Sequence, residues 1–149
     1  MIAAEPTHGS GRTMHIERIE HVQLAMPPGG EARAREFYGR ALGIPEVPKP
    51  PHLASRGGCW FERGELKIHL GVDPDFRPAR KAHAALLVRD LRTLATTLGS
   101  LGYAPREEQP LQGYLRVYVD DPFGNRLELL ERSAQGAGVD ARGAATGSR

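Results

Sequence analysis

The same order of hydrophobic patterns occurs twice along this chain of 149 residues, and this repeat limits the possible folds more than any other feature. A strand, a helix and two further strands separated by a turn are indicated over residues 16–76, and again over residues 77–131. Neither copy could bury the apolar face of its sheet alone. We therefore expect an α+β fold in which two βαβββ modules form one curved, mixed, eight-stranded sheet with the helices outside.

The most informative stretch is the strand, turn and strand of residues 113–131. The first of these strands alternates apolar with polar residues, as a half-buried strand does. The turn is Asp121-Pro-Phe-Gly-Asn125, in which proline presets φ and glycine or asparagine accepts a positive φ. The second strand has Leu127 and Leu129 on one face and Glu128 on the other. A carboxylate in the middle of a strand, on the face away from the leucines, needs a partner.

Histidine residues occupy matching positions in other strands of the two modules. His21 and Gln23 alternate with apolar residues in the first strand, and His69 does so in the last strand of the first module. His83 opens the second module as His21 opens the first. Because successive side chains of a strand point to opposite faces, each histidine is expected on the face away from the apolar residues.

Length, charge and cysteine content restrict the class of protein. One domain, residues 16–131, is expected between two disordered tails, residues 1–15 and 132–149. The net charge of +2 comes from the C-terminal tail, so nucleic acid is not an expected partner. No apolar run reaches the roughly 18 residues of a membrane span, and no signal peptide is recognisable. The single cysteine, Cys59, excludes an intrachain disulfide and favours a cytoplasmic location.

The residues of the candidate site occupy equivalent places in the two modules. Any one histidine on a strand is more often a structural residue than a ligand, and Glu128 could instead pair with Arg116 or Arg126. A twofold that superposes the modules would, however, bring all four side chains towards one point. Three imidazoles and one carboxylate suit a divalent Zn, Fe, Mn, Ni or Co ion. The candidate metal ligands are His21, His69, His83 and Glu128.

This pattern resembles the vicinal oxygen chelate superfamily, which includes glyoxalase I, extradiol dioxygenases and the bleomycin resistance proteins. The resemblance covers residues 16–131, and its most specific part is Asp121-Pro-Phe-Gly-Asn-Arg-Leu-Glu128, similar to the family's turn and metal-binding glutamate. His21 and His83 match the opening strands of the family, and His69 stands where glyoxalase I has a glutamate. The resemblance implies paired modules in a homodimer, around a metal with open positions for a small oxygenated substrate.

The ligand set is compatible with several reactions. Glyoxalase-like or lyase-like isomerisation is favoured, with Glu128 moving a proton and His69 acting as a fourth ligand or a base. If only His21, His83 and Glu128 bind, the set becomes the triad suited to Fe(II) and O₂. An extradiol-type dioxygenase is the alternative, although residues 109–113 lack the histidine that ring cleavage uses.

A metal-free drug-binding protein, like the bleomycin resistance proteins, is a further alternative from a different class. Gln23, Arg116 and Tyr118 have the non-core positions of their strands. They are candidates for binding the substrate, or else ordinary residues of the sheet face.

Overall fold

The computed structural model describes residues 14–134, and both βαβββ modules are present. The first module contains β1 (Val22–Met26), α1 (Glu31–Ala34), η1 (Arg35–Ala41), β2 (Glu46–Val47), α2 (Pro51–Ala54), β3 (Cys59–Arg63) and β4 (Leu66–Val72). The second contains β5 (Ala84–Leu87), α3 (Leu91–Ser100), β6 (Arg106–Glu107), β7 (Tyr114–Asp120) and β8 (Arg126–Arg132). The expected tails lie outside the described residues, apart from 14–15 and 132–134. No helix within residues 14–134 is long and apolar enough to cross a membrane.

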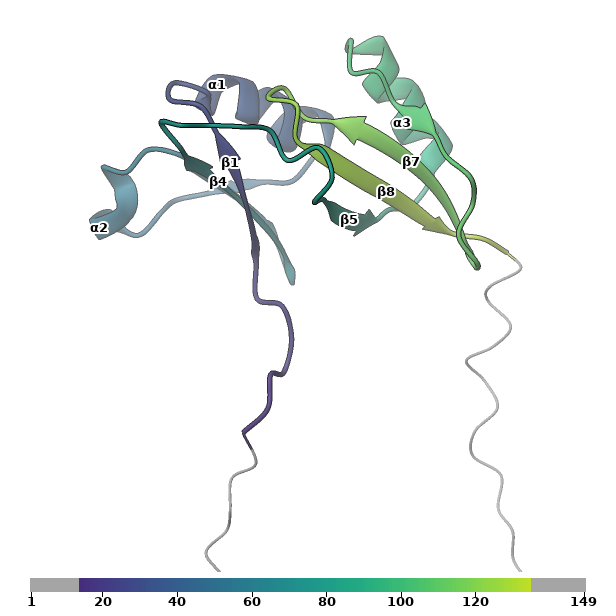
Figure 1. Cartoon of the computed structure of the whole chain (residues 1–149), viewed down its shortest axis with the longest axis horizontal. Helices are drawn as coiled ribbons and strands as arrows, with labels where there is room; N and C mark the ends of the chain where they lie inside the picture. Colours follow the sequence, from purple (N-terminus) through teal and green to yellow (C-terminus); the bar gives the residue numbers. More distant parts are fainter. Residues whose placement is uncertain (1–13, 135–149) are drawn as a thin grey trace, which may run out of the picture.

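The eight strands are divided between two four-stranded sheets of identical topology. Sheet A has the order β1-β4-β3-β2 and sheet B the order β5-β8-β7-β6. The first strand of each module is parallel to the last, and the remaining pairs are antiparallel. The sheets lie side by side below the helices (Figure 1), and no strand ladder joins them among the described residues. β1 and β5 are therefore edge strands.

The first strand is shorter than the sequence suggested. β1 begins at Val22 and not at residue 16, and the segment 14–21 extends away from the body (Figure 1). Ile16 and Ile19 are 95% and 78% exposed there. Alternating residues predict an extended backbone, but only pairing with a neighbouring strand makes it part of a sheet, and the pairing of β1 with β4 begins at Val22.

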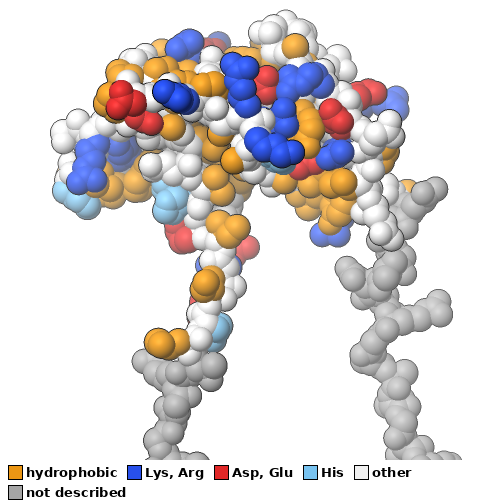
Figure 2. Space-filling view, viewed as in Figure 1, with side chains coloured by type: hydrophobic (Ala, Val, Ile, Leu, Met, Phe, Trp, Pro, Cys, Tyr) orange, Lys and Arg blue, Asp and Glu red, His pale blue; other side chains and the backbone are white. Residues whose placement is uncertain are grey.

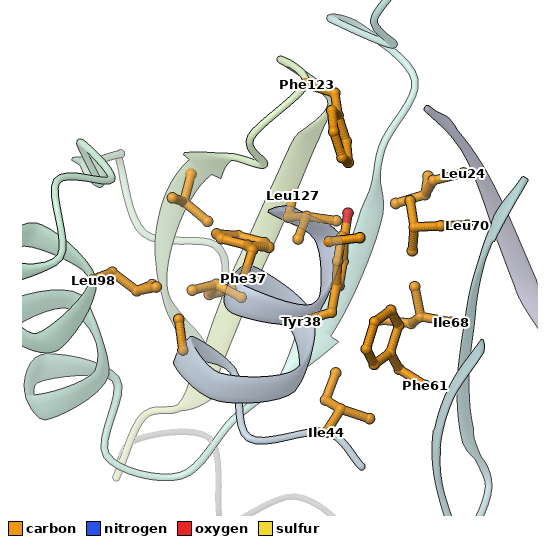
Figure 3. Close-up of a cluster of buried hydrophobic side chains, with 14 of the residues drawn as sticks. Leu24, Phe37, Tyr38, Ile44, Phe61, Ile68, Leu70, Leu98, Phe123 and Leu127 are labelled. Atoms are coloured by element: carbon orange, nitrogen blue, oxygen red, sulfur yellow. The ribbon is translucent and has the colours of Figure 1, made fainter. Parts of the chain in front are cut away.

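The core lies between the two sheets and around the first helix. Phe37 and Tyr38 of η1 are fully buried and point in different directions (Figure 3). The Tyr38 ring stacks on Phe61 of β3, while the Phe37 ring meets Tyr103 edge to face beyond α3. One helix thus contributes to the apolar layer of both sheets, which explains why neither module needs to bury its sheet alone.

Hydrogen bonds and a glycine mark the end of η1 and the start of α3. The N–H of Leu42 bonds the carbonyl of Phe37 at 2.9 Å, which gives η1 its π-helical spacing, and Gly43 follows with φ of 67°. At the start of α3, the Asp90 carboxylate accepts the Thr93 N–H at 3.1 Å. Asp90 is therefore the N-cap of α3.

The turn between β7 and β8 ties three segments of the chain together. The buried Asp121 carboxylate accepts hydrogen bonds from the N–H groups of Phe123 and Asn125, at 2.9 Å each, and from the Tyr38 hydroxyl at 2.7 Å. The Asn125 amide donates to the carbonyl of Ala25 in β1 and accepts from Ala79 in the linker. Burial and the neighbouring Asp121 carboxylate raise the pKa of Tyr38, so its hydroxyl stays a donor. The turn therefore holds the two modules together.

Cys59 should be unreactive in the folded protein. The side chain is 1% exposed, and burial raises the pKa of its thiol from 9.0 to about 11. Since only the thiolate reacts, the thiolate fraction at pH 8 should fall about 100-fold. We expect no alkylation by iodoacetamide at pH 8 until denaturant is added, as counted by mass spectrometry. Rapid labelling of the native protein would contradict this burial.

Candidate functional site

The candidate site residues lie on the face of each sheet that is opposite the core. The two faces have a similar arrangement of side chains. In sheet A, His69 of β4 pairs directly with Trp60 of β3. In sheet B, Glu128 of β8 pairs directly with Tyr118 of β7. A titratable side chain on the last strand of each module therefore lies beside an aromatic ring on the preceding strand.

We call the site face of sheet A the first half-site and the site face of sheet B the second half-site. His69 is the most enclosed residue of the first half-site. It is 5% exposed, and its ring lies parallel to Trp60, with centroids 4.1 Å apart and an interplanar angle of 4°. The ring of His21 covers the other side, with a centroid distance of 4.4 Å and an angle of 21°. Three stacked rings thus leave His69 little freedom to rotate.

Glu62 is a site residue that the sequence pattern did not identify. Its carboxylate lies 2.8 Å from Nε2 of His69. Because an ionised carboxylate only accepts, Nε2 carries the hydrogen and a neutral His69 keeps its lone pair on Nδ1. A signal was present, since Glu62 shares the alternation of β3 with Trp60, but the polar residues that follow it favoured a turn at this position.

His21 offers the opposite ring nitrogen. Its Nδ1 lies 2.6 Å from the carboxylate of Glu20. Hydrogen bonds from Lys67 and His21 lower the pKa of Glu20 to about 2, so this carboxylate accepts and Nδ1 donates. Neutral His21 therefore has its lone pair on Nε2, the atom furthest from the backbone.

The second half-site is a direct pair between His83 and Glu128. Nε2 of His83 lies 3.0 Å from Oε2 of Glu128, while Nδ1 donates to the carbonyl of Lys81 at 2.8 Å. Both ring nitrogens thus face oxygen acceptors, one from the backbone and one from Glu128. Glu128 is only 6% exposed, and a buried charge is costly unless it is paired. Its two oxygens are bonded by His83 and Arg116.

Two of the three expected substrate-binding residues contact this half-site. Nη1 of Arg116 donates to Oε1 of Glu128 and to the Tyr118 hydroxyl, at 3.2 Å each, and the bond to Glu128 raises the pKa of Arg116. The Tyr118 ring meets His83 edge to face at 5.5 Å. Gln23 lies in the first half-site. Its amide lies against Gly71, where an added Cβ would be only 2.6 Å from Nε2 of Gln23.

The four expected ligands form two pairs, one in each module, and not one cluster. His21 lies against His69, and His83 against Glu128. No group of three or more His, Cys, Asp or Glu side chains able to hold a metal occurs within residues 14–134. His21 and His83 nevertheless both line a cavity of about 750 Å³ between the edge strands β1 and β5.

The second pair suits a metal. Two ligand atoms that are each about 2.1 Å from a metal, with a ligand–metal–ligand angle of about 90°, lie about 3.0 Å apart. The distance between His83 Nε2 and Glu128 Oε2 has this value, which is also that of an ordinary hydrogen bond. The hydrogen bond to Lys81 also orients His83 so that Nε2 faces the carboxylate, as backbone partners orient metal-binding histidines.

Comparison with solved structures identifies the fold. A glyoxalase family protein from Bacillus anthracis has 42% identity and a TM-score of 0.77, over 81% of this chain and 99% of that chain. The fosfomycin resistance protein FosX from Listeria monocytogenes has 15% identity and a TM-score of 0.66, over 82% and 98%. A glyoxalase/dioxygenase from Nostoc punctiforme has 22% identity and a TM-score of 0.62, over 78% and 92%.

The three solved structures share the topology found here, and the first is similar in sequence over almost its whole length. No protein-family model and no curated protein matches the sequence. The chain belongs to the glyoxalase family, within the vicinal oxygen chelate superfamily that its paired modules and its strand, turn and glutamate had suggested.

Proposed function

We propose that this protein is an enzyme that uses a divalent metal to chelate neighbouring oxygens of a small substrate, with isomerisation or a lyase reaction as its chemistry. The observation that carries the proposal is the pair of His83 and Glu128, in which Glu128 is buried, His83 is oriented by Lys81, and the two facing atoms are 3.0 Å apart. A bound divalent ion would supply Lewis acidity for a developing enediolate or alkoxide.

The ring nitrogens favour three of the four expected ligands. His21 and His83 each have Nδ1 engaged by an oxygen. Nε2 of His21 is left for a metal, and Nε2 of His83 faces Glu128, which is itself a candidate ligand of the same ion. Together with Glu128 they form a set of two histidines and one carboxylate, which suits several first-row ions. In His69 the situation is reversed, because Nε2 is bonded to Glu62.

His69 is therefore better suited to holding and exchanging a proton than to binding the metal. Its ring also stacks on that of His21. Replacing His69 by alanine should preserve metal binding but lower turnover. The sequence had left open whether His69 is a ligand or a base, and the hydrogen bond to Glu62 favours the base.

We further propose that the complete site forms in a homodimer, with His21 from one copy and His83 and Glu128 from the other. The described part of one chain contains the two half-sites but no group of three ligands. The unpaired edges of β1 and β5 flank the cavity between them. Leu87 and Ile19, 57% and 78% exposed, lie in or beside these edges and would be covered by a second copy.

Elemental analysis of untagged protein tests the metal. We expect about one equivalent of Zn, Fe, Mn, Ni or Co per chain, and a loss of affinity of more than about 100-fold in Glu128→Ala. Glu36→Ala is the matched control, because Glu36 is an exposed carboxylate paired with Arg40 on η1.

A metal-free protein that also fails to take up these five ions would contradict the proposal. That result would favour the alternative, a protein that binds a drug without a metal. Ligand screening would then replace enzymology.

A further inference from the structure

One guanidinium on the site face of sheet B lacks an anionic partner. Arg126 is half-buried, and its guanidinium lies over the ring of Tyr118, 4.9 Å from the centroid. Its Nε is the buried side-chain nitrogen within residues 14–134 that has no hydrogen-bond partner. Leaving a buried donor unpaired is unfavourable, and native structures contain few such groups.

The nearby carboxylates are engaged by other residues. Asp120 lies opposite Arg126 in the strand register, but Arg106 binds both of its oxygens, at 2.9 and 3.2 Å. Glu128, two residues further along β8 on the same face, is bonded by His83 and Arg116. Among residues 14–134, Arg126 makes no ion pair.

Arg126 also lies close to the proposed metal centre. The ring of Tyr118 contacts the Arg126 guanidinium and, at 5.5 Å, the ring of His83. Only one aromatic ring therefore separates Arg126 from a candidate ligand. Lys and Arg side chains gather on this face of the second module, over the area of β7 and β8 (Figure 2).

We propose that Arg126 binds an oxyanion, a carboxylate or phosphate group, of the substrate. The inference rests on the proposed function, because it places this group beside the metal-chelating oxygens. The two Nη groups of a guanidinium form a planar fork that matches two oxygens of such a group. An oxyanion at these groups would compensate the charge of Arg126, and Tyr118 already holds the guanidinium in place. The substrate class is then a small oxygenated acid or phosphate ester.

Two-dimensional ¹H–¹⁵N spectra of the arginine Nε–Hε groups test this directly. The Arg126 resonance is assigned by its absence in Arg126→Gln and Arg126→Lys. We expect acetate or inorganic phosphate to shift it saturably in wild-type protein freed of metal, and acetamide, the neutral analogue of acetate, to leave it in place.

In Arg126→Gln we expect at least a tenfold loss of affinity for the anion, and in Arg126→Lys a smaller loss, because a lysine keeps the charge without the fork. Trp60 fluorescence reports binding in the variants if a bound anion alters the site, and calorimetry reports it in any case. Arg132→Gln is the matched control, since Arg132 also lies on β8 over a tyrosine ring but is exposed.

The outcomes separate this inference from the proposed function. A shift by acetate alone, phosphate alone or both supports the oxyanion site and identifies its class. No shift with either anion, or equal affinity in wild type and Arg126→Gln, overturns it. Metal uptake is measured on the same samples: uptake without an anion effect refutes only this inference, whereas an anion effect without uptake refutes only the metal-dependent function.

Discussion

Replacing Asp121 by alanine should lower the free energy of unfolding by about 4 kcal/mol, and the melting temperature by about 10 °C or more. The carboxylate is 4% exposed and accepts from four donors: the N–H groups of Phe123 and Asn125, the Asn125 amide and the Tyr38 hydroxyl. Alanine leaves all four buried donors without their acceptor. Thermal and chemical denaturation followed by circular dichroism would measure the loss.

Two variants show whether this loss comes from the buried network. Tyr38→Phe removes one of the four bonds and should cost about 1–2 kcal/mol. Asp120→Ala alters the adjacent residue, whose half-exposed carboxylate pairs with Arg106, and should cost less than about 1 kcal/mol. Equal effects of Asp121→Ala and Asp120→Ala would contradict the role of this turn in holding the modules together.

Mixing two inactive variants should restore metal sites if each site is shared between chains. His21→Ala damages the first module and Glu128→Ala the second, so each variant alone should bind no metal tightly. After subunit exchange about half of the dimers are mixed, and each mixed dimer has one intact site and one doubly damaged site. We expect about a quarter of the wild-type metal content, measured by elemental analysis after gel filtration.

A second mixture controls this experiment. His83 and Glu128 belong to the same half-site, 3.0 Å apart, so mixing His83→Ala with Glu128→Ala should restore nothing in either arrangement. Failure of the first mixture, with wild-type protein retaining its metal, would indicate a site completed within one chain. A single monomeric species in gel filtration with light scattering would lead to the same conclusion.

Residue patterns were sufficient for the parts of the fold that depend on local periodicity. The alternation around Leu127 and Leu129, with Glu128 on the opposite face, occurs as expected. The start of β1 was wrong by six residues, because the exposed segment 14–21 has the alternation of a strand but no strand beside it. Pairing is a tertiary property, and alternation alone does not reveal it.

The candidate site was predicted unevenly for a related reason. The sequence identified four titratable residues because each sits at the same place in its module. It did not identify Glu62 or Arg126 as site residues, since their importance lies in contacts across strands: one bonds His69, and the other is left without a partner.

The repeat in the sequence by itself determined that this protein has two βαβββ modules with chemical side chains on the faces away from the core. A strand's period of two places such residues whatever surrounds them. Only the tertiary structure decided how those faces meet. One helix fills the core between two separate sheets, so the four expected ligands become two pairs, each with hydrogen-bond partners that select a ring nitrogen. Periodicity acts along the chain, whereas that selection depends on atoms brought together from distant strands.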